Sequence, residues 1–316
     1  MTTITRTVNK RSRWNVLYKG IMRHWQLYLL MLLPIIWVIM FRYVPIWGSQ
    51  IAFKNYKLAE GVAGSEWADP LFKHFIKFFK SNQFERLLTN TIGLSLFNIV
   101  AGIFPPIILA IALNYCRSKF FGKTVQLVTY MPYFISTVLV VSILTQMLSL
   151  SGMVNTAIKA LGGKPIQFLS RPEWFKPLYV FSELWQKTGY NAVVYIAALA
   201  AISPELHEAA IVDGANIWQR IRHVDIPGIM PTMITLTILA CGRILTMGYE
   251  KVLLMQNLQN MRASDIISTY VYRIGIAEGM QFSYSTAIGL FQSVVSLLMI
   301  TLVNGISRKV SDSSLW

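Results

Sequence analysis

Long apolar blocks alternate with charged connections along the whole chain. A helix needs about 20 mainly apolar residues to cross the hydrocarbon core of a bilayer, and six blocks approach or exceed that length. The blocks cover residues 25–46, 87–115, 124–148, 177–202, 230–250 and 284–304. This pattern predicts an all-α membrane protein with six transmembrane helices.

Proline lies inside several of these blocks, at Pro34, at the pair Pro105-Pro106 and at Pro132. In water proline breaks a helix, but in a membrane the neighbouring helices can satisfy the carbonyl that it frees. We therefore expect kinks at these positions.

The Lys and Arg residues of the connections set the expected orientation. With a cytoplasmic N-terminus, the inner and the outer connections hold 13 Lys and Arg each, so the count alone does not decide. The bias of positive charge toward the cytoplasm is strongest in short loops and before the first helix. There, the basic segment 1–24 and the turn 117–123 favour a cytoplasmic N-terminus. Six spans then place both termini in the cytoplasm, and we expect a basic cytoplasmic segment 1–24 followed by a membrane domain 25–316.

Composition and charge agree with a membrane protein. Apolar residues make up 54% of the chain and charged residues only 14%, whereas about a quarter of the residues in soluble domains are charged. The net charge of +15 would suggest nucleic acid as a partner of a soluble protein. Here the cations separate apolar blocks and face water or headgroups. We expect membrane lipid as a partner and no nucleic acid.

Residues for catalysis or metal binding form no recognisable group. The two cysteines and four histidines are scattered, so neither a disulfide framework nor a metal site is expected. The segment Gly122-Lys123-Thr124 resembles the end of a phosphate-binding loop, but Arg117 occupies the place of its first glycine. We expect a chain that is not an enzyme and that binds no metal, ATP or other cofactor itself.

Lysines and phenylalanines alternate in the first outer connection. Lys73, Lys77 and Lys80 recur at helical spacing, and aromatic residues cover much of the remaining surface of such a helix. This pattern predicts a short helix that lies at the membrane interface. Anchoring in the interface is favoured over partner binding.

The inner connection 203–227 predicts a helix that projects into the cytosol. Ser203 can cap this helix, Pro204 fits its first position, and Gly214 can adopt the left-handed conformation that ends it. A second helix is expected over 216–223, and Pro227 marks the expected start of the fifth span. Small residues on the first helix allow another protein to approach closely, so this connection predicts a docking element.

This connection resembles a known signature. Glu208-Ala209-Ala210, followed by Gly214 and by Val224-Asp225-Ile226-Pro227, is similar to the EAA motif of permease subunits of bacterial type I ABC importers. Further segments are similar to the carbohydrate subfamily that imports oligosaccharides released from polysaccharides, such as alginate or aldouronate fragments. These segments are 43–45, 50–54, 90–91, 130–136, 195–199 and 269–273.

The resemblance implies a six-helix type I ABC importer permease domain in the bacterial cytoplasmic (inner) membrane. Two such permeases, expected to be different chains, would form one pathway. Two ATP-binding subunits would hold ATP and Mg and hydrolyse the nucleotide, and a periplasmic or extracellular solute-binding protein would deliver the oligosaccharide. Carried over to this sequence, the residues that contact the ATPase are Glu208, Ala209, Ala210 and Gly214, with Asp213 beside them. The alternative is that Ala209, Ala210 and Gly214 serve only the packing of the turn.

Polar residues inside the spans are the candidates for a substrate pathway, because such residues are costly in lipid and usually face a protein interior or water. The candidates are Glu183, Gln186, Lys187, Tyr190 and Arg243. Trp185 and Tyr190 can offer aromatic faces to sugar rings. Glu183 and Lys187, four residues apart, can equally form an ion pair that braces neighbouring helices.

The sequence leaves two alternatives for the cargo and two for the transport mechanism. The cations Arg42, Lys187 and Arg243 within the spans, with a positive outer mouth, favour an acidic oligosaccharide over a neutral one. The alternative function is a secondary transporter or channel that works without an ATPase. In that case Glu183, Lys187, Arg243 and Glu250 would form an ion relay.

Overall fold

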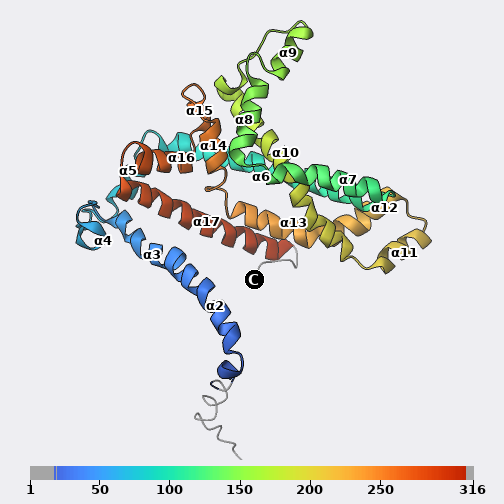
Figure 1. Cartoon of the computed structure of the whole chain (residues 1–316), viewed down its shortest axis with the longest axis horizontal. Coiled ribbons are helices and arrows are strands. Elements are labelled where there is room, and N and C mark those ends of the chain that lie inside the picture. The colour runs from blue at the N-terminus through green and yellow to red at the C-terminus, as the bar shows by residue number, and fades with distance from the viewer. Residues whose placement is uncertain (1–17, 19, 311–316) are drawn as a thin grey trace, which may run out of the picture. The chain divides into compact units, whose positions relative to one another are not determined.

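The computed structural model describes Tyr18 and residues 20–310 (Figure 1). Regular structure in these residues is helical, apart from one bridge that pairs Lys54 with Trp67. The chain divides into two compact units, Met1–Leu71 and Phe72–Trp316. The expected basic segment 1–24 lies outside the described residues except for Tyr18 and residues 20–24.

The first unit contains one long apolar helical run, Trp25–Phe53. It consists of α2 (Trp25–Val38), the π-turn η1 (Ile39–Tyr43), α3 (Val44–Gly48) and the 3-10 turn η2 (Ser49–Phe53). The short helix α4 (Gly61–Gly64) follows. The Lys54 ammonium donates a hydrogen bond of 2.7 Å to the Val62 carbonyl of this helix and lies over the Trp67 ring. The run covers the first predicted span.

The second unit is a helical bundle in which α6 and α10 pack along each other, and α13 packs against α6, α10 and α17 (Figure 1). Its first half holds α5 (Lys73–Phe79), α6 (Phe84–Asn114), α7 (Lys119–Tyr130), η3 (Met131–Phe134), α8 (Thr137–Leu148), α9 (Met153–Ala160), η4 (Phe168–Ser170) and α10 (Pro172–Ala200). Its second half holds α11 (Pro204–Val212), α12 (Ile217–Arg220), η5 (Ile221–Asp225), α13 (Ile226–Cys241), α14 (Tyr249–Met255), α15 (Met261–Ser264), α16 (Ile267–Tyr272), η6 (Arg273–Ala277) and α17 (Phe282–Val310).

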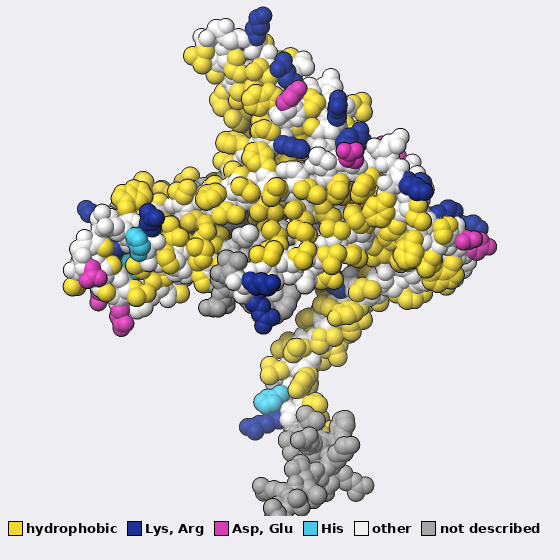
Figure 2. All heavy atoms as spheres, turned by 180° about the vertical axis from the view of Figure 1, so that it is seen from behind, with side chains coloured by type: hydrophobic (Ala, Val, Ile, Leu, Met, Phe, Trp, Pro, Cys, Tyr) yellow, Lys and Arg dark blue, Asp and Glu magenta, His cyan; other side chains and the backbone are white. Residues whose placement is uncertain are grey.

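Five helical runs in the described residues are long and apolar enough to cross a membrane: Trp25–Phe53, Phe84–Asn114, Thr137–Ala160, Ile217–Cys241 and Phe282–Lys309. A sixth arises where α10 continues into α11 through a bend of 70°. Figure 2 shows hydrophobic side chains along the flanks of the helices and charged side chains mainly toward their ends. The expectation of an all-α protein with six spans is confirmed.

The bounds predicted for the third span, 124–148, are wrong. The helix α7 ends at Tyr130, a 3-10 turn follows, and Ile135 is extended before α8 begins at Thr137. Pro132 lies at the start of the 3-10 turn, where its missing N–H is tolerated. The Ser136 hydroxyl then caps the new helix by accepting a hydrogen bond from the Leu139 N–H. The apolar run of this region is instead Thr137–Ala160.

The fifth span is also displaced from its predicted bounds, 230–250. One continuous helical run covers Ile217–Cys241, so the separate helix over 216–223 and the start at Pro227 are both wrong. The π-turn η5 directly before α13 widens the helix where Pro227 would meet the carbonyl four residues earlier. The chain then turns over 242–248, so that Arg243 and Glu250 lie outside this helix.

The helix predicted in the first outer connection forms as α5, and one of its phenylalanines packs inside the protein. Its Phe78 is 1% exposed and packs edge-to-face on Phe84 and Phe291 at centroid distances of 5.0 and 5.7 Å. Burying a phenylalanine contributes about 1.5–3 kcal/mol. Phe78 therefore packs α5 on α6 and α17, while Phe72 and Phe79 stay half-exposed, and the anchoring of α5 at the membrane interface stays a prediction.

Candidate functional site

A buried ion-pair cluster lies on the inward face of α10. Glu183 is 6% exposed, and each of its carboxylate oxygens pairs with one ammonium group: Lys187 at 2.6 Å and Lys251 at 2.8 Å. Lys251 comes from α14 and is itself buried, whereas Lys187 has a half-exposed side chain. Buried carboxylates are tolerated when paired and hydrogen-bonded in this way.

Gln186 connects this cluster to the break in the third span. Its amide nitrogen donates to the Ile135 carbonyl at 2.9 Å, and its amide oxygen accepts from Lys251, also at 2.9 Å. Ile135 lies in the extended segment between η3 and α8, where its carbonyl has left the helical ladder. One buried side chain on α10 therefore joins the broken third span to α14.

A cavity of about 550 Å³ opens beside the cluster, within the range of about 300–1,000 Å³ that is usual for small-molecule sites. Tyr133 on its wall stacks on Tyr190 with ring centroids 3.8 Å apart and planes within 4°. Polar and aromatic groups thus face the same space, as a sugar ring requires. The lining residues include Tyr133, Tyr179, Glu183, Gln186, Lys187, Tyr249, Glu250 and Lys251.

The structure brings most of the pathway candidates together. Glu183, Gln186 and Lys187 line the cavity, and Tyr190 supports it through the stacked ring of Tyr133. Arg243 does not join them: it is exposed, lies in the turn after α13 and does not line this cavity. Its inclusion followed from placing the helix end nine residues too late along the chain.

Several lining residues were missed from the sequence, among them Lys251, Tyr133 and Tyr249. Lys251 follows the expected end of the fifth span, so it was counted with the outer connection rather than with the buried charges. Tyr133 and Tyr249 line the cavity, whereas the expected Trp185 is half-exposed and does not. Tyr133 lies in the segment 130–136, one of those that carried the resemblance, so that segment was the available signal.

The inner connection has the predicted local structure at most positions. Pro204 occupies the first turn of α11 and Glu205 adds negative charge there, where the helix dipole favours it. Gly214 has φ +76°, in the left-handed region, and Ala215 N–H closes the turn on the Ala210 carbonyl at 2.8 Å. Ser203 is the N-cap residue, but its side chain makes no capping hydrogen bond, contrary to expectation.

The coupling candidates lie on an open surface. Glu208, Ala209, Asp213 and Gly214 are exposed, and Ala210 is half-buried. An added Cβ at Gly214 would meet no atom of the described residues within 4 Å. Apolar residues beside them are also exposed, Val212 by 86% and Trp218 by 79%. Packing inside the chain therefore does not account for these small residues, which favours docking of another protein.

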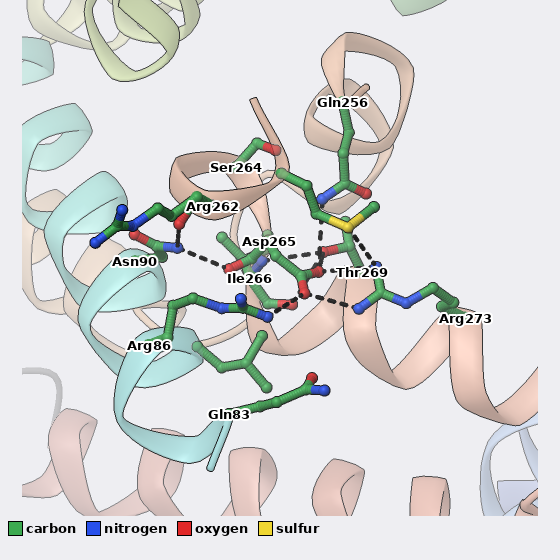
Figure 3. Close-up of polar contacts among 12 residues, drawn as sticks. Gln83, Arg86, Asn90, Gln256, Arg262, Ser264, Asp265, Ile266, Thr269 and Arg273 are labelled. Carbon is green, nitrogen blue, oxygen red and sulfur yellow. Dashed lines mark hydrogen bonds and ion pairs between the residues drawn. The ribbon is translucent and has the colours of Figure 1, made fainter. Parts of the chain in front are cut away.

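A second buried cluster holds the outer connections together (Figure 3). The fully buried Asp265 accepts two hydrogen bonds from Arg273, at 2.7 and 3.2 Å, and Arg86 of α6 lies 3.5 Å away. Burial lowers the pKa of Arg273, but its hydrogen bonds with Asp265 and the charge of that carboxylate outweigh burial and raise it. Asn90 donates to the carbonyls of Arg262 and Asp265.

This cluster gives a structural role to two of the segments that are similar to the carbohydrate subfamily. Residues 90–91 and 269–273 are far apart in the sequence but meet here, and Thr91 also accepts a hydrogen bond from the Ile267 N–H at 2.9 Å. The contacts fix α15 and α16 to α6. They are structural and hold this end of the bundle together.

Comparisons with known proteins agree with this geometry. A family model described as a binding-protein-dependent transport system inner membrane component matches residues 102–312. The polygalacturonan/rhamnogalacturonan transport system permease protein YteP of Bacillus subtilis (strain 168) is 39% identical, covering 97% of this chain and 95% of its own length. The lactose transport system permease protein LacF of Rhizobium radiobacter is 28% identical over 73% of this chain and 77% of its own.

A solved structure is also similar. One chain of a bacterial alginate ABC transporter in complex with an alginate pentasaccharide-bound periplasmic protein superimposes with a TM-score of 0.85. It is 38% identical, and the match covers 95% of this chain and 99% of that one.

Proposed function

Because the chain belongs to the family of binding-protein-dependent transport system inner membrane components, and so is an inner-membrane permease subunit of the ABC importer class, we propose that its cargo is an oligosaccharide released from a polysaccharide. Uronate oligomers are the proposed cargo class. The matched region includes the cavity residues and the whole inner connection. A secondary transporter or channel is set aside, because the family membership accounts for the docking loop that such a carrier does not need.

Relatives and charge both support an acidic cargo. One similar protein is named for polygalacturonan, a polymer of galacturonate, and one similar structure is of a transporter for alginate, an acidic polysaccharide. Within the buried cluster two ammonium groups face one carboxylate. Lys187 is half-exposed and lines the cavity, and Lys251 keeps one oxygen of Glu183 paired, so the Lys187 ammonium can contact a sugar carboxylate while Glu183 retains a buried partner. Glu250 also lines the cavity, so its charged lining residues balance, and the half-exposed Lys187 beside the stacked tyrosines is the observation that carries the proposal.

The same proposal assigns the partners. A second permease, a different chain, completes the pathway. Two ATP-binding subunits hold ATP and Mg, and one of them docks on the loop 203–227 through Glu208, Ala209, Ala210, Asp213 and Gly214. A solute-binding protein presents the sugar at the outer face. Both termini, including the basic segment 1–24, lie in the cytoplasm.

Uptake by the complete transporter in vesicles tests the assignment of Lys187. The Lys187→Gln variant should import a uronate trisaccharide about tenfold more slowly, which corresponds to about 1.4 kcal/mol of lost attraction, and should import a neutral trisaccharide at an unchanged rate. Lys164→Gln removes the same charge from an exposed loop position and serves as the control. Equal loss for both sugars, or no loss for the uronate, would contradict the role of Lys187.

A further inference from the structure

Asp225 is a fully buried carboxylate at the inner end of the second unit, in the π-turn that leads into α13. Its Oδ2 accepts a hydrogen bond of 2.7 Å from the hydroxyl of Tyr115, the residue that ends α6. Its Oδ1 lies 3.4 Å from Nε2 of His207, which belongs to α11. A single carboxylate therefore contacts the ends of two spans and the helix of the docking loop.

The surroundings hold this contact in place. Arg220, one turn before Asp225, lies over the Tyr115 ring with 5.5 Å between its guanidinium carbon and the ring centroid. Burial, and then the hydrogen bond to Asp225, raise the pKa of Tyr115 to about 12. The hydroxyl thus stays protonated at neutral pH and continues to donate. Asp225 Oδ1 receives no hydrogen bond from the described residues, and it lies within ion-pair distance of His207 Nε2.

The helix α11 depends strongly on this contact. It lies wholly within the described residues and contains no buried side chain, so apolar packing holds it only weakly to the spans. A buried carboxylate that loses its partners pays the full cost of desolvation. When α11 is displaced, Asp225, Tyr115 and His207 are therefore expected to move together rather than separate.

We propose that Asp225 is a positioning residue that transmits displacement of α11 to the inner ends of α6 and α13. This inference rests on the proposed docking of an ATP-binding subunit on α11. It assigns a role to Tyr115 and His207, which lie on different elements and are joined through one carboxylate. Movement imposed on the docking loop then reaches the two spans through a polar contact, in addition to the chain connection through Gly214.

Three variants of the complete transporter in vesicles test the proposal: Tyr115→Phe, Asp225→Asn and His207→Gln. Tyr115→Phe removes one oxygen and keeps the ring beneath Arg220, so it tests the link even if Asp225→Asn folds poorly. The control is His223→Gln, because His223 lies on the same connection, is exposed and contacts the Gln219 carbonyl rather than Asp225. The measured quantities are sugar transported, ATP hydrolysed and the unfolding temperature.

We expect Tyr115→Phe and Asp225→Asn to lower the sugar transported per ATP hydrolysed about tenfold, within the usual range of couplings between sites, while His223→Gln leaves this ratio unchanged. A lower unfolding temperature with an unchanged ratio would show a purely structural role and overturn the inference. A Glu208→Cys variant cross-linked to a cysteine on the ATP-binding subunit separates the two failures. Absence of any cross-link contradicts the docking itself, whereas normal cross-linking with an unchanged ratio contradicts only the role of Asp225.

Discussion

Replacing Lys251 with methionine tests whether the buried cluster holds α14 to α10. The substitution keeps most of the side-chain volume but removes the ammonium from one oxygen of Glu183, at 2.8 Å, and from the amide oxygen of Gln186, at 2.9 Å. Glu183 would retain only Lys187. Removing one partner from a buried ion pair costs about 3–5 kcal/mol, and because Lys187 remains, we expect about 3 kcal/mol, the lower end of that range.

Thermal unfolding of the purified protein in detergent measures this effect. For a unit of this size each kcal/mol lowers the unfolding temperature by about 2–4 °C, so Lys251→Met should lower it by about 6–12 °C. Adding Glu183→Gln removes the charge left behind, so the double variant should lose less than the sum of the two single losses, by about 1–3 kcal/mol. Lys164→Met, at an exposed position, is the control. An unfolding temperature equal to that of the native chain, or strictly additive losses, would refute the reasoning.

Three further predictions follow from other contacts. Gly214→Ala should strain the left-handed turn by about 1–2 kcal/mol and weaken co-purification of the ATP-binding subunit. The control is Gly162→Ala, because Gly162 also has a positive φ, +81°, and space for a Cβ among the described residues. This variant should strain its own turn but leave co-purification intact. Gly189→Ala should disrupt the crossing of α10 and α7 and lower the unfolding temperature, because its Cβ would collide with the Thr129 carbonyl. The control is Gly289→Ala, whose Cβ would meet no atom of the described residues within 4 Å and which should leave the unfolding temperature unchanged. The Tyr115 hydroxyl has a folded-state pKa of about 12 against 10.0 for a free tyrosine, so its contribution to stability is complete below pH 10 and is lost as pH rises from 10 to 12. Tyr115→Phe should abolish that part of the pH dependence, and an unchanged difference between the two proteins across this pH range would contradict it.

Local sequence features predicted the membrane architecture and the first helix of the connection 203–227 well. A run of about 20 apolar residues is a strong signal, and Pro204 and Gly214 act through their own backbone preferences, so their effects are visible without tertiary context. The capping box of α12, in which Asn216 and Gln219 satisfy each other's backbone N–H groups, is equally local and was readable from its spacing. Ser203 failed as a side-chain cap because a residue type favours such a bond without ensuring its geometry.

The cavity was harder to predict because it depends on contacts between distant residues. Hydrophobicity alone does not show that Pro132 and Ser136 divide an apolar run into two helices, or that Gly248 adopts φ +85° before α14. Glu183 and Lys251 are 68 residues apart in the chain and meet only because α14 folds back on α10. Intramembrane polarity therefore indicated three residues that line a cavity, Glu183, Gln186 and Lys187, whereas the other lining residues required the structure.

Import by the complete transporter shows whether this chain carries uronate oligomers in an ATP-driven, binding-protein-dependent way. The chain, its permease partner and the ATP-binding subunits would be reconstituted in vesicles with ATP inside and a solute-binding protein loaded with a uronate trisaccharide outside. We expect the trisaccharide to accumulate inside and the loaded binding protein to stimulate ATP hydrolysis, and we expect removal of either ATP or the binding protein to stop uptake. Uptake driven by an ion gradient without ATP, or by this chain without an ATP-binding subunit, would contradict this function.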